Sequence, residues 1–198
     1  NAGGKVTFGD SVFGGFETLN LKAGRILKAR DHPNADSLLL LEVDIGKTIQ
    51  VVAGLKAYYT KEEMEGREVV VVSNLKPAKL RGEQSQGMLL AADAGEIVKL
   101  VSPPSGSRPG DAVSSGLKQS DRVIEFKDFQ KLILRVAEVS GDHLDVGRAV
   151  KAKGPTELKG RKVVVYLPSE DAEEALVLSS ERGPVTVDDA MPGGATVR

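Results

Sequence analysis

Three cations lie close together in the segment of residues 74–88, whose sequence is NLKPAKLRGEQSQGM. Lys76, Lys79 and Arg81 fall within six residues, and the proline and glycine among them disfavour a regular strand. We therefore expect an exposed basic loop, held between two apolar strands. Cations on a rigid loop can position phosphate groups, so the segment predicts a phosphate-binding surface. An ordinary solvated surface is the alternative.

Polar residues inside this segment are candidates for further contacts with a phosphate-bearing ligand. Asn74, Ser85 and Gln86 can donate and accept hydrogen bonds. The Asn74 amide can equally brace the turn that precedes Lys76. Both roles for Asn74 therefore stay open at this point.

A second group of candidates lies earlier in the chain. Lys28 and Arg30 stand at the end of a predicted strand, and we expect them to complete the phosphate-binding surface. In the following loop, DHPNAD, His32 and Asn34 either contact the ligand or shape the turn, where Asn34 and Asp36 would bond backbone amides. One histidine beside one aspartate provides too few ligands for a metal site.

The composition narrows the classes of function. The chain has 27 lysines and arginines against 28 acidic residues, a net charge of −1, so a uniformly basic nucleic-acid coat is not expected and any binding surface is local. It has no cysteine and two histidines, which argues against disulfides, thiolate catalysis and a metal centre. It has no P-loop, nucleophile elbow or dinucleotide-binding fingerprint. We therefore expect no catalytic residue and no cofactor.

The hydropathy pattern and the first residues bear on location. No apolar run approaches the roughly 20 residues of a membrane span, and the N-terminus lacks a signal-peptide pattern. We expect a cytoplasmic protein with no membrane partner. Because the chain starts at Asn1 and not at methionine, we also expect a piece of a longer protein or a cloning remnant at its start.

Short β-branched runs between turns predict a mostly β protein. A capping-box pattern at residues 60–63, TKEE, predicts one short helix between the third and fourth strands. This order is typical of an OB-fold barrel, whose closure leaves few exposed strand edges. The expected strands of this unit cover residues 19–29, 38–44, 49–53, 68–73, 87–93 and 97–101.

The second half of the chain repeats the first, which predicts two tandem OB-fold copies. We place the copies at residues 1–116 and 117–198, with a linker near residues 114–121. Chance similarity between two β-rich halves is the alternative. The matched segments are VTFGD (6–10) with VIEFKDF (123–129), LKAGRI (21–26) with LRVAEV (134–139), GREVVV (66–71) with GRKVVV (160–165), MLL (88–90) with LVL (176–178), and PG (109–110) with PG (192–193).

The second copy lacks the basic segment of the first. Where the first copy has KPAKLRG, the second continues from Pro168 into SEDAEEA, which places Glu170, Asp171, Glu173 and Glu174 there. Because acidic side chains repel phosphate, we expect the second copy to keep the barrel but not the binding surface.

Three motifs in the first half carry a family resemblance. They are HPNADSLLLLEVDIG at residues 32–46, VVAGL at 51–55 and NLKPAKLRGEQSQGMLLAAD at 74–93. They resemble the tRNA-binding domain found at the C-terminus of many methionyl-tRNA synthetases. The same domain occurs in the endothelial monocyte-activating polypeptide and in free-standing structure-specific tRNA-binding proteins.

The resemblance implies a non-catalytic module that binds tRNA by shape, through phosphates and 2′-hydroxyls, with an aminoacyl-tRNA synthetase as a further partner. Ser85, Gln86 and Met88 fall in a segment similar to the family's S-x-G-M element near the RNA. Met88 also starts a strand and can equally be a core residue. A secretion chaperone that binds peptides shares this domain, so a protein-binding chaperone or an assembly domain is the alternative function.

Bacterial relatives of this kind commonly bind tRNA as homodimers. The resemblance therefore implies that the fused second barrel replaces a dimer partner, giving a pseudo-dimer with one RNA-binding face. Two barrels on a flexible linker are the alternative arrangement.

Overall fold

Runs of valine form the central strands, and alternate residues of each run face different cores. All four valines of β5 (Glu68–Val72) are buried. Val69 and Val71 pack in the core of the first unit, whereas Val70 and Val72 pack in a core that contains residues of both units. β14 (Lys162–Leu167) of the second unit divides its residues in the same way. A strand that is buried on both faces does not alternate between apolar and polar residues. This explains why the valines of β5 and β14 are consecutive.

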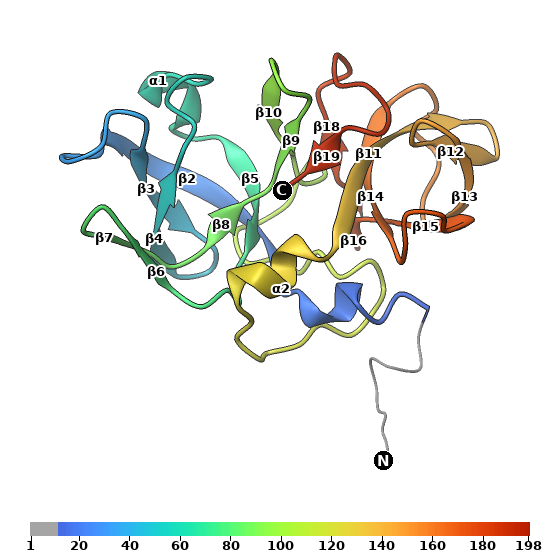
Figure 1. Cartoon of the computed structure of the whole chain (residues 1–198), viewed down its shortest axis with the longest axis horizontal. Coiled ribbons are helices and arrows are strands. Elements are labelled where there is room, and N and C mark those ends of the chain that lie inside the picture. Colours follow the sequence, from blue (N-terminus) through green and yellow to red (C-terminus); the bar gives the residue numbers. More distant parts are fainter. Residues whose placement is uncertain (1–11) are drawn as a thin grey trace.

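The computed structural model describes residues 12–198, and they fold into two β-rich units packed side by side (Figure 1). The predicted match at residues 6–10 lies outside the described residues. The elements of the first unit are η1 (Phe16–Thr18), β2 (Leu21–Asp31), β3 (Leu39–Asp44), β4 (Thr48–Ala53), α1 (Lys61–Met64), β5, β6 (Ala78–Leu80), β7 (Glu83–Ser85), β8 (Met88–Leu89), β9 (Ala91–Asp93) and β10 (Val98–Leu100).

The predicted capping box at the start of α1 is present. The Thr60 hydroxyl accepts a hydrogen bond from the Glu63 N–H at 3.0 Å, and the Glu63 carboxylate accepts one from the Thr60 N–H at 2.8 Å. Two helical donors are satisfied in this way. No helix in the described part of the chain is long and apolar enough to cross a membrane.

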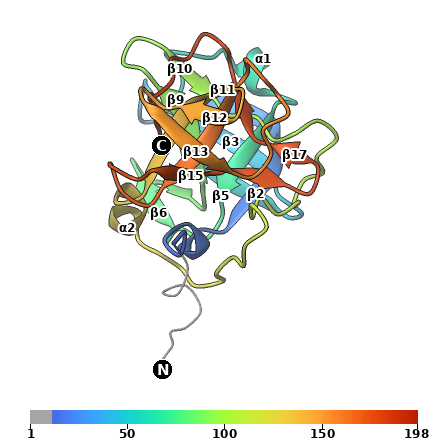
Figure 2. The same ribbon diagram turned by 90° about the vertical axis from the view of Figure 1, so that its right-hand side faces the viewer.

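The second unit contains a closed barrel of five strands. Its order is β11-β12-β13-β15-β14, and pairing of β14 with β11 closes the ring. β13 pairs with β15 in parallel, and the other pairs are antiparallel. Figure 2 looks onto this barrel, with β13 and β15 in front. The elements are α2 (Phe126–Gln130), β11 (Ile133–Ser140), β12 (His143–Asp145), β13 (Ala149–Lys153), β14, β15 (Glu174–Val177), β16 (Ser179–Ser180), β17 (Gly183–Pro184), β18 (Thr186–Val187) and β19 (Thr196–Val197).

The first unit has the corresponding strand order, β4-β3-β2-β5-β8, without a strand pairing between β4 and β8. The mostly β, OB-like architecture expected from the sequence is therefore confirmed. It is one half-closed barrel beside one closed barrel, and the edge left between β4 and β8 is where the basic segment lies.

The two units share the register of their strands. Leu21 lies opposite Val72 in the first unit, and Leu134 lies opposite Tyr166 in the second. These pairs coincide with the sequence match of residues 21–26 to 134–139. The match of residues 109–110 to 192–193 is shifted by one residue in the structure. Gly110 donates its N–H to the Ala23 oxygen of β2, and the equivalent bond to the Val136 oxygen of β11 comes from Gly194 and not from Gly193. Origin by duplication stays a prediction.

A common core joins the units, so barrels on a flexible linker are not what the chain forms. Phe16 is fully buried, and its ring centroid lies 5.9 Å from that of Tyr166 in the second barrel. β19 pairs with β9 of the first unit and with β11 of the second. The linker is also bonded to the first unit, because the Gln119 side-chain amide donates to the backbone oxygens of Leu21 and Val113.

Among the described residues three ion pairs cross between the units, and the longest joins Lys99 to Asp188 at 3.9 Å. Asp111 accepts from the Arg182 guanidinium at 2.9 Å, and Asp93 accepts from Arg198 at 2.6 Å. The pKa of Asp111 lies below its ordinary value because the Arg108 N–H and the Arg182 guanidinium both donate to it. The pKa of Asp93 is lowered by the backbone N–H of Gly95 and by Arg198.

These lowered pKa values predict a loss of stability in acid. A carboxylate with a depressed folded-state pKa stabilises the fold above its unfolded pKa, and this contribution disappears as the pH falls below about 4. The double variant Asp93→Asn with Asp111→Asn should be less stable at neutral pH and should lose less stability between neutral and acidic pH. Denaturant titrations at several pH values measure this. Asp36→Asn with Asp121→Asn, at two exposed aspartates, is the control, and equal pH profiles for both pairs would contradict the prediction.

Candidate functional site

The basic segment forms a β-hairpin, so the expectation of an irregular loop is wrong. β6 and β7 pair with Ala78 opposite Ser85. The turn consists of Arg81, with a φ of 53°, and Gly82, with a φ of 93°. A two-residue turn in which both residues have positive φ fits the twist of a hairpin. Gly82 therefore allows the hairpin turn, and Pro77 precedes the first strand of the hairpin.

The predicted cations project from this hairpin and from its approach. Lys76, Lys79 and Arg81 are all exposed. Lys76 precedes β6, Lys79 is its middle residue, and Arg81 occupies the turn. A two-stranded support restricts the backbone of these residues, so a ligand does not have to order a loose loop on binding.

Ser85 and Gln86 join the hairpin to the open edge of the first barrel. The Ser85 hydroxyl accepts from the Val52 N–H at 3.0 Å and donates to the Gly87 oxygen at 2.9 Å, and Ser85 is buried. Gln86 is exposed, and it bonds Gln50 twice, through its backbone N–H at 2.7 Å and its side-chain oxygen at 2.8 Å. The two residues thus take the place of a strand pairing between β4 and β8.

Lys28 and Arg30 lie on the barrel surface beside the hairpin. Lys28 is opposite Glu42 in β3, which is opposite Gln50 in β4. The Gln50 side-chain amide in turn donates to the Gln84 oxygen of β7 at 2.9 Å. Lys28 and Arg30 are exposed, two residues apart on β2. The outer surface of the sheet therefore carries cations on both sides of Gln50, with the Glu42 carboxylate among them.

His32 is a buried connector between its own loop and the hairpin. Its Nδ1 accepts from the Asn34 N–H at 2.9 Å, so the ring proton is on Nε2, which donates to the Leu80 oxygen at 2.9 Å. His32 is 5% exposed, whereas Asn34 is exposed. Of the two roles left open for this loop, the turn-shaping one is present for His32, and it is the histidine ring that bonds the backbone amide at residues 32–34.

Asn74 ties three segments together at the base of the hairpin. Its amide oxygen accepts from the Asn20 N–H at 3.0 Å, and its amide nitrogen donates to the oxygens of Thr18 at 2.9 Å and Arg122 at 2.8 Å. The residue is 7% exposed. All of these bonds are internal, which supports the bracing role.

Asn74→Ala should destabilise the protein by about 2–4 kcal/mol, because it leaves buried donors and acceptors without partners. Urea denaturation followed by circular dichroism measures this. Gln84→Ala, on the exposed strand of the hairpin, is the control and should change the free energy of unfolding by less than about 1 kcal/mol. Equal effects would show that the Asn74 bonds contribute little.

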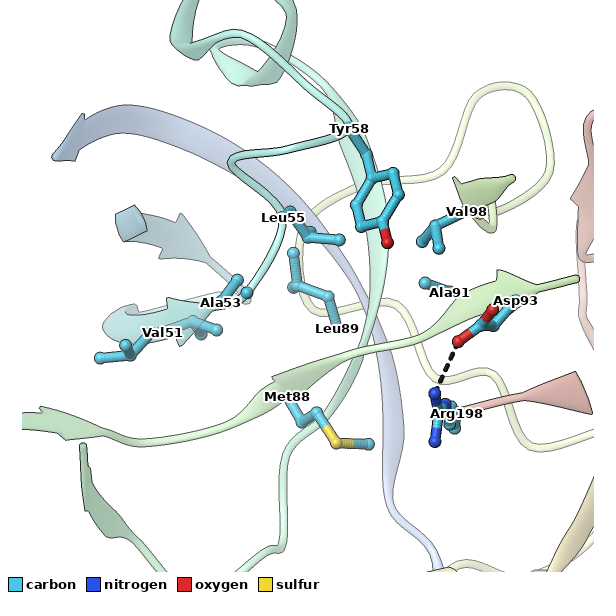
Figure 3. Close-up of a pocket in the computed structure, with 12 residues that line it drawn as sticks. Val51, Ala53, Leu55, Tyr58, Met88, Leu89, Ala91, Asp93, Val98 and Arg198 are labelled. Carbon is cyan, nitrogen blue, oxygen red and sulfur yellow. Dashed lines mark hydrogen bonds and ion pairs between the residues drawn. The ribbon is translucent and has the colours of Figure 1, made fainter. Parts of the chain in front are cut away.

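Met88 separates two hollows on this side of the molecule. One, of about 320 Å³, is shown in Figure 3 with Tyr58, Met88 and the Asp93–Arg198 ion pair around it. The other, of about 260 Å³, lies beneath the hairpin. Met88 is half-buried and packs against the common core. It therefore has a packing role and also faces both hollows.

The five predicted cations have no acidic partner within residues 12–198. Many other cations are neutralised by ion pairs, and the described arginines that form one are Arg25, Arg135, Arg161, Arg182 and Arg198. A cation without an internal partner retains its charge for a ligand. The same described range contains no group of three or more histidines and carboxylates that could hold a metal ion.

Two residues near the hairpin are not among those predicted from the sequence. Gln50 positions β7, and a polar residue between the apolar residues of a predicted strand was the available signal. Phe126, from the second unit, lines the same hollow as Lys76. The motif F-x-x-F occurs before the first strand of each unit, with Phe13 and Phe16 in one and Phe126 and Phe129 in the other. No local pattern places Phe126 beside the hairpin.

Comparisons with known proteins match the first unit. A family model described as "Putative tRNA binding domain" matches residues 21–112. The methionine–tRNA ligase of Thermococcus onnurineus is 52% identical over 102 residues, which are 51% of this chain and 14% of that protein. The mouse (Mus musculus) aminoacyl tRNA synthase complex-interacting multifunctional protein 1 is 46% identical over 98 residues, covering 48% of this chain and 32% of that protein. The chain thus spans a minor part of both relatives.

A solved structure matches both units. The C-terminal domain of Plasmodium vivax p43 superimposes with a TM-score of 0.63 at 21% identity, covering 92% of this chain and 98% of that one. At this identity the likeness shows the fold of the pair of units. All the candidate residues, from Lys28 to Met88, lie within the part that the family model matches. Residues 21–112 of this chain therefore belong to the tRNA-binding domain family.

Proposed function

We propose that this chain is a non-catalytic tRNA-binding module whose first unit holds the RNA backbone. The observation that carries the proposal is a group of five exposed cations without ion-pair partners among the described residues. They lie on the braced hairpin and its approach (Lys76, Lys79 and Arg81) and on β2 (Lys28 and Arg30). They lie within the residues that match a tRNA-binding family. Cations held on a rigid surface bind phosphates with little sequence preference, as recognition of an RNA by its shape requires.

The other candidate residues support this surface in different ways. His32, Asn74 and Ser85 are buried, with their side-chain polar atoms in hydrogen bonds within the protein. We propose that they position the cations and do not contact RNA. Asn34 and Gln86 are exposed at the edges of the surface and can reach a sugar or phosphate.

The second unit, in this proposal, takes the place of a dimer partner. Its β14–β15 connection, at residues 168–173, has no basic hairpin, and its Glu170 carboxylate pairs with Arg135 at 3.1 Å. The common core and the β9–β19–β11 pairing supply within one chain an interface of the kind a homodimer builds between two. Sedimentation should show a monomer that binds tRNA, and an obligate dimer would contradict this role.

A synthetase is the proposed second partner. Two relatives of the first unit are, by name, a methionine–tRNA ligase and a protein that interacts with a synthetase complex. A tethered RNA-binding module raises the effective concentration of tRNA at an attached enzyme without catalysing a reaction itself. We propose a cytoplasmic location on the same grounds, since tRNA charging takes place there.

Filter binding of unfractionated tRNA at two salt concentrations tests the proposed function. Neutralisation of about four or five phosphates gives a slope of log affinity against log salt of roughly −3 to −4. Affinity should therefore fall about 60- to 250-fold between about 50 and 200 mM salt. Binding that is absent at the lower salt, or that does not change with salt, would contradict the proposal.

A further inference from the structure

The hollow beneath the hairpin is formed by both units. Its apolar lining comes from β4, β6, β8 and the hairpin's approach in the first unit, together with Phe126 at the start of α2 in the second. In both ribbon views α2 lies beside β6 (Figures 1 and 2). The volume of about 260 Å³ is below the ~300–1,000 Å³ of pockets for drug-sized ligands. The hollow therefore suits a single ring system.

Phe126 is held at this hollow by backbone hydrogen bonds between the units. The Lys76 N–H donates to the Ile124 oxygen at 2.8 Å, and the Ile124 N–H donates to the Asn74 oxygen at 2.9 Å. The Asn74 side chain also bonds the Arg122 oxygen. The residues just before α2 are therefore fixed to the residues just before β6, which keeps Phe126 near Lys76.

The Phe126 ring is available to a ligand. Phe126 is 53% exposed, and its ring is stacked with that of Phe129 at an interplanar angle of 23° and a centroid distance of 6.3 Å. Phe13, at the same distance before residues 21–26 as Phe126 is before the matching residues 134–139, is 4% exposed and lies against Tyr166 with ring centroids 6.4 Å apart. Phe13 is therefore part of the core, whereas Phe126 lies at the surface beside Lys76.

The charge around the hollow favours a nucleic acid over a peptide side chain as the occupant. Among the described residues that line it, Lys76 alone is charged, and Lys79 and Arg81 project from the hairpin above. Lys127 follows Phe126 on α2 and is exposed. The acidic residue of α2, Asp128, accepts from the N–H of the exposed Glu125 at the start of the helix. Unpaired bases stack on aromatic side chains while their phosphates bind nearby cations.

We propose that the hollow binds one unstacked nucleobase of an RNA, stacked on Phe126, with an adjoining phosphate at Lys76. The inference rests on the proposed function and adds a base-binding position to a surface that otherwise holds the backbone. It also assigns the second unit a direct part in binding. Although its own β14–β15 connection is acidic, this unit supplies the aromatic side chain that completes the site of the first.

The test compares two RNAs of equal length, one fully paired and one with a single bulged 2-aminopurine, bound to the full chain. Phe126→Ala should lower affinity for the bulged RNA about 5- to 150-fold, which is the usual effect of removing a stacking side chain. Its affinity for the paired RNA and its salt slope should stay unchanged. The bulged 2-aminopurine should be quenched by the unaltered protein but not by this variant. Lys76→Ala should weaken both RNAs and reduce the salt slope by about 1.

Two more variants separate stacking from apolar contact and from misfolding. Phe126→Trp should retain the preference for the bulged RNA, whereas Phe126→Leu should lose it because leucine cannot stack. Val123→Ala, at a residue 65% exposed in the same segment, should bind both RNAs normally. An unfolded apolar peptide serves as competitor, and displacement of the quenched base by this peptide would favour a protein ligand and overturn the inference.

The outcomes distinguish this inference from the proposed function. If the unaltered protein binds neither RNA, the proposed function fails and the inference with it. If the protein binds RNA, but Phe126→Ala binds the bulged RNA normally or weakens both RNAs equally, only the base-binding position is refuted.

Discussion

Replacing Lys76, Lys79 and Arg81 together by alanine should weaken tRNA binding by at least about tenfold. The three side chains are exposed, without ion-pair partners in the described range, so their loss removes contacts to phosphate and little of the fold. If each contacts one phosphate, the slope of log affinity against log salt should become shallower by roughly 2.7, which is three contacts at about 0.9 each. Filter binding across a salt series measures both quantities, and circular dichroism checks the fold.

The chain offers a matched control for this variant. Lys151, Lys153 and Lys159 are exposed cations of the second unit, and changing them to alanine removes the same total charge. If binding depended on net charge alone, both triple variants would weaken it equally. We expect the control to keep its affinity within about threefold. A control that loses as much affinity as the hairpin variant would refute the assignment of the RNA-binding surface to the first unit.

Phe16→Ala should destabilise the whole chain by about 3–5 kcal/mol, the usual cost of truncating a buried phenylalanine. Phe16 comes before the first strand of the first unit but packs on Tyr166 of the second, and both belong to the common core. Its loss should therefore lower the midpoint of a single cooperative transition, followed in urea by circular dichroism. Phe126→Ala, at a half-exposed ring, is the control and should cost less than about 1 kcal/mol.

The same experiment tests whether the units are one cooperative body. Two separate transitions, with only one of them moved by Phe16→Ala, would show that the units unfold independently. That result would contradict the role of the second unit as a built-in dimer partner, even if tRNA binding itself were confirmed.

Local patterns predicted the elements whose causes are local. The capping box at Thr60 involves residues three positions apart, and the structure contains it as expected. Most strand positions in the first barrel also followed from valine and leucine runs. The four consecutive valines of β5 are buried on both faces of the strand, which therefore lies between two cores. An uninterrupted valine run of this kind indicates that a second layer covers the sheet.

The site was predicted in part, because its organisation depends on contacts between distant segments. The sequence does not predict the hairpin, because Pro77 and Gly82 disfavour a strand, whereas in the structure the Arg81–Gly82 pair supplies the turn. The sequence NLKPAKLRGEQSQGM does not show which of its polar residues are exposed and which are buried. In the structure Lys76 is exposed and Ser85 is buried. Only the bond from Val52 to the Ser85 hydroxyl, which spans 33 positions, shows that Ser85 closes the barrel edge.

Hydrogen–deuterium exchange of the full chain, with and without tRNA, tests the central claim most directly. Amides at residues 76–88 and 28–34 should exchange more slowly in the complex, because the RNA backbone lies across the hairpin and the end of β2. Residues 168–173, the acidic connection of the second barrel, should exchange at the same rate in both states. Protection confined to residues 168–173, with the hairpin unaffected, would contradict the account.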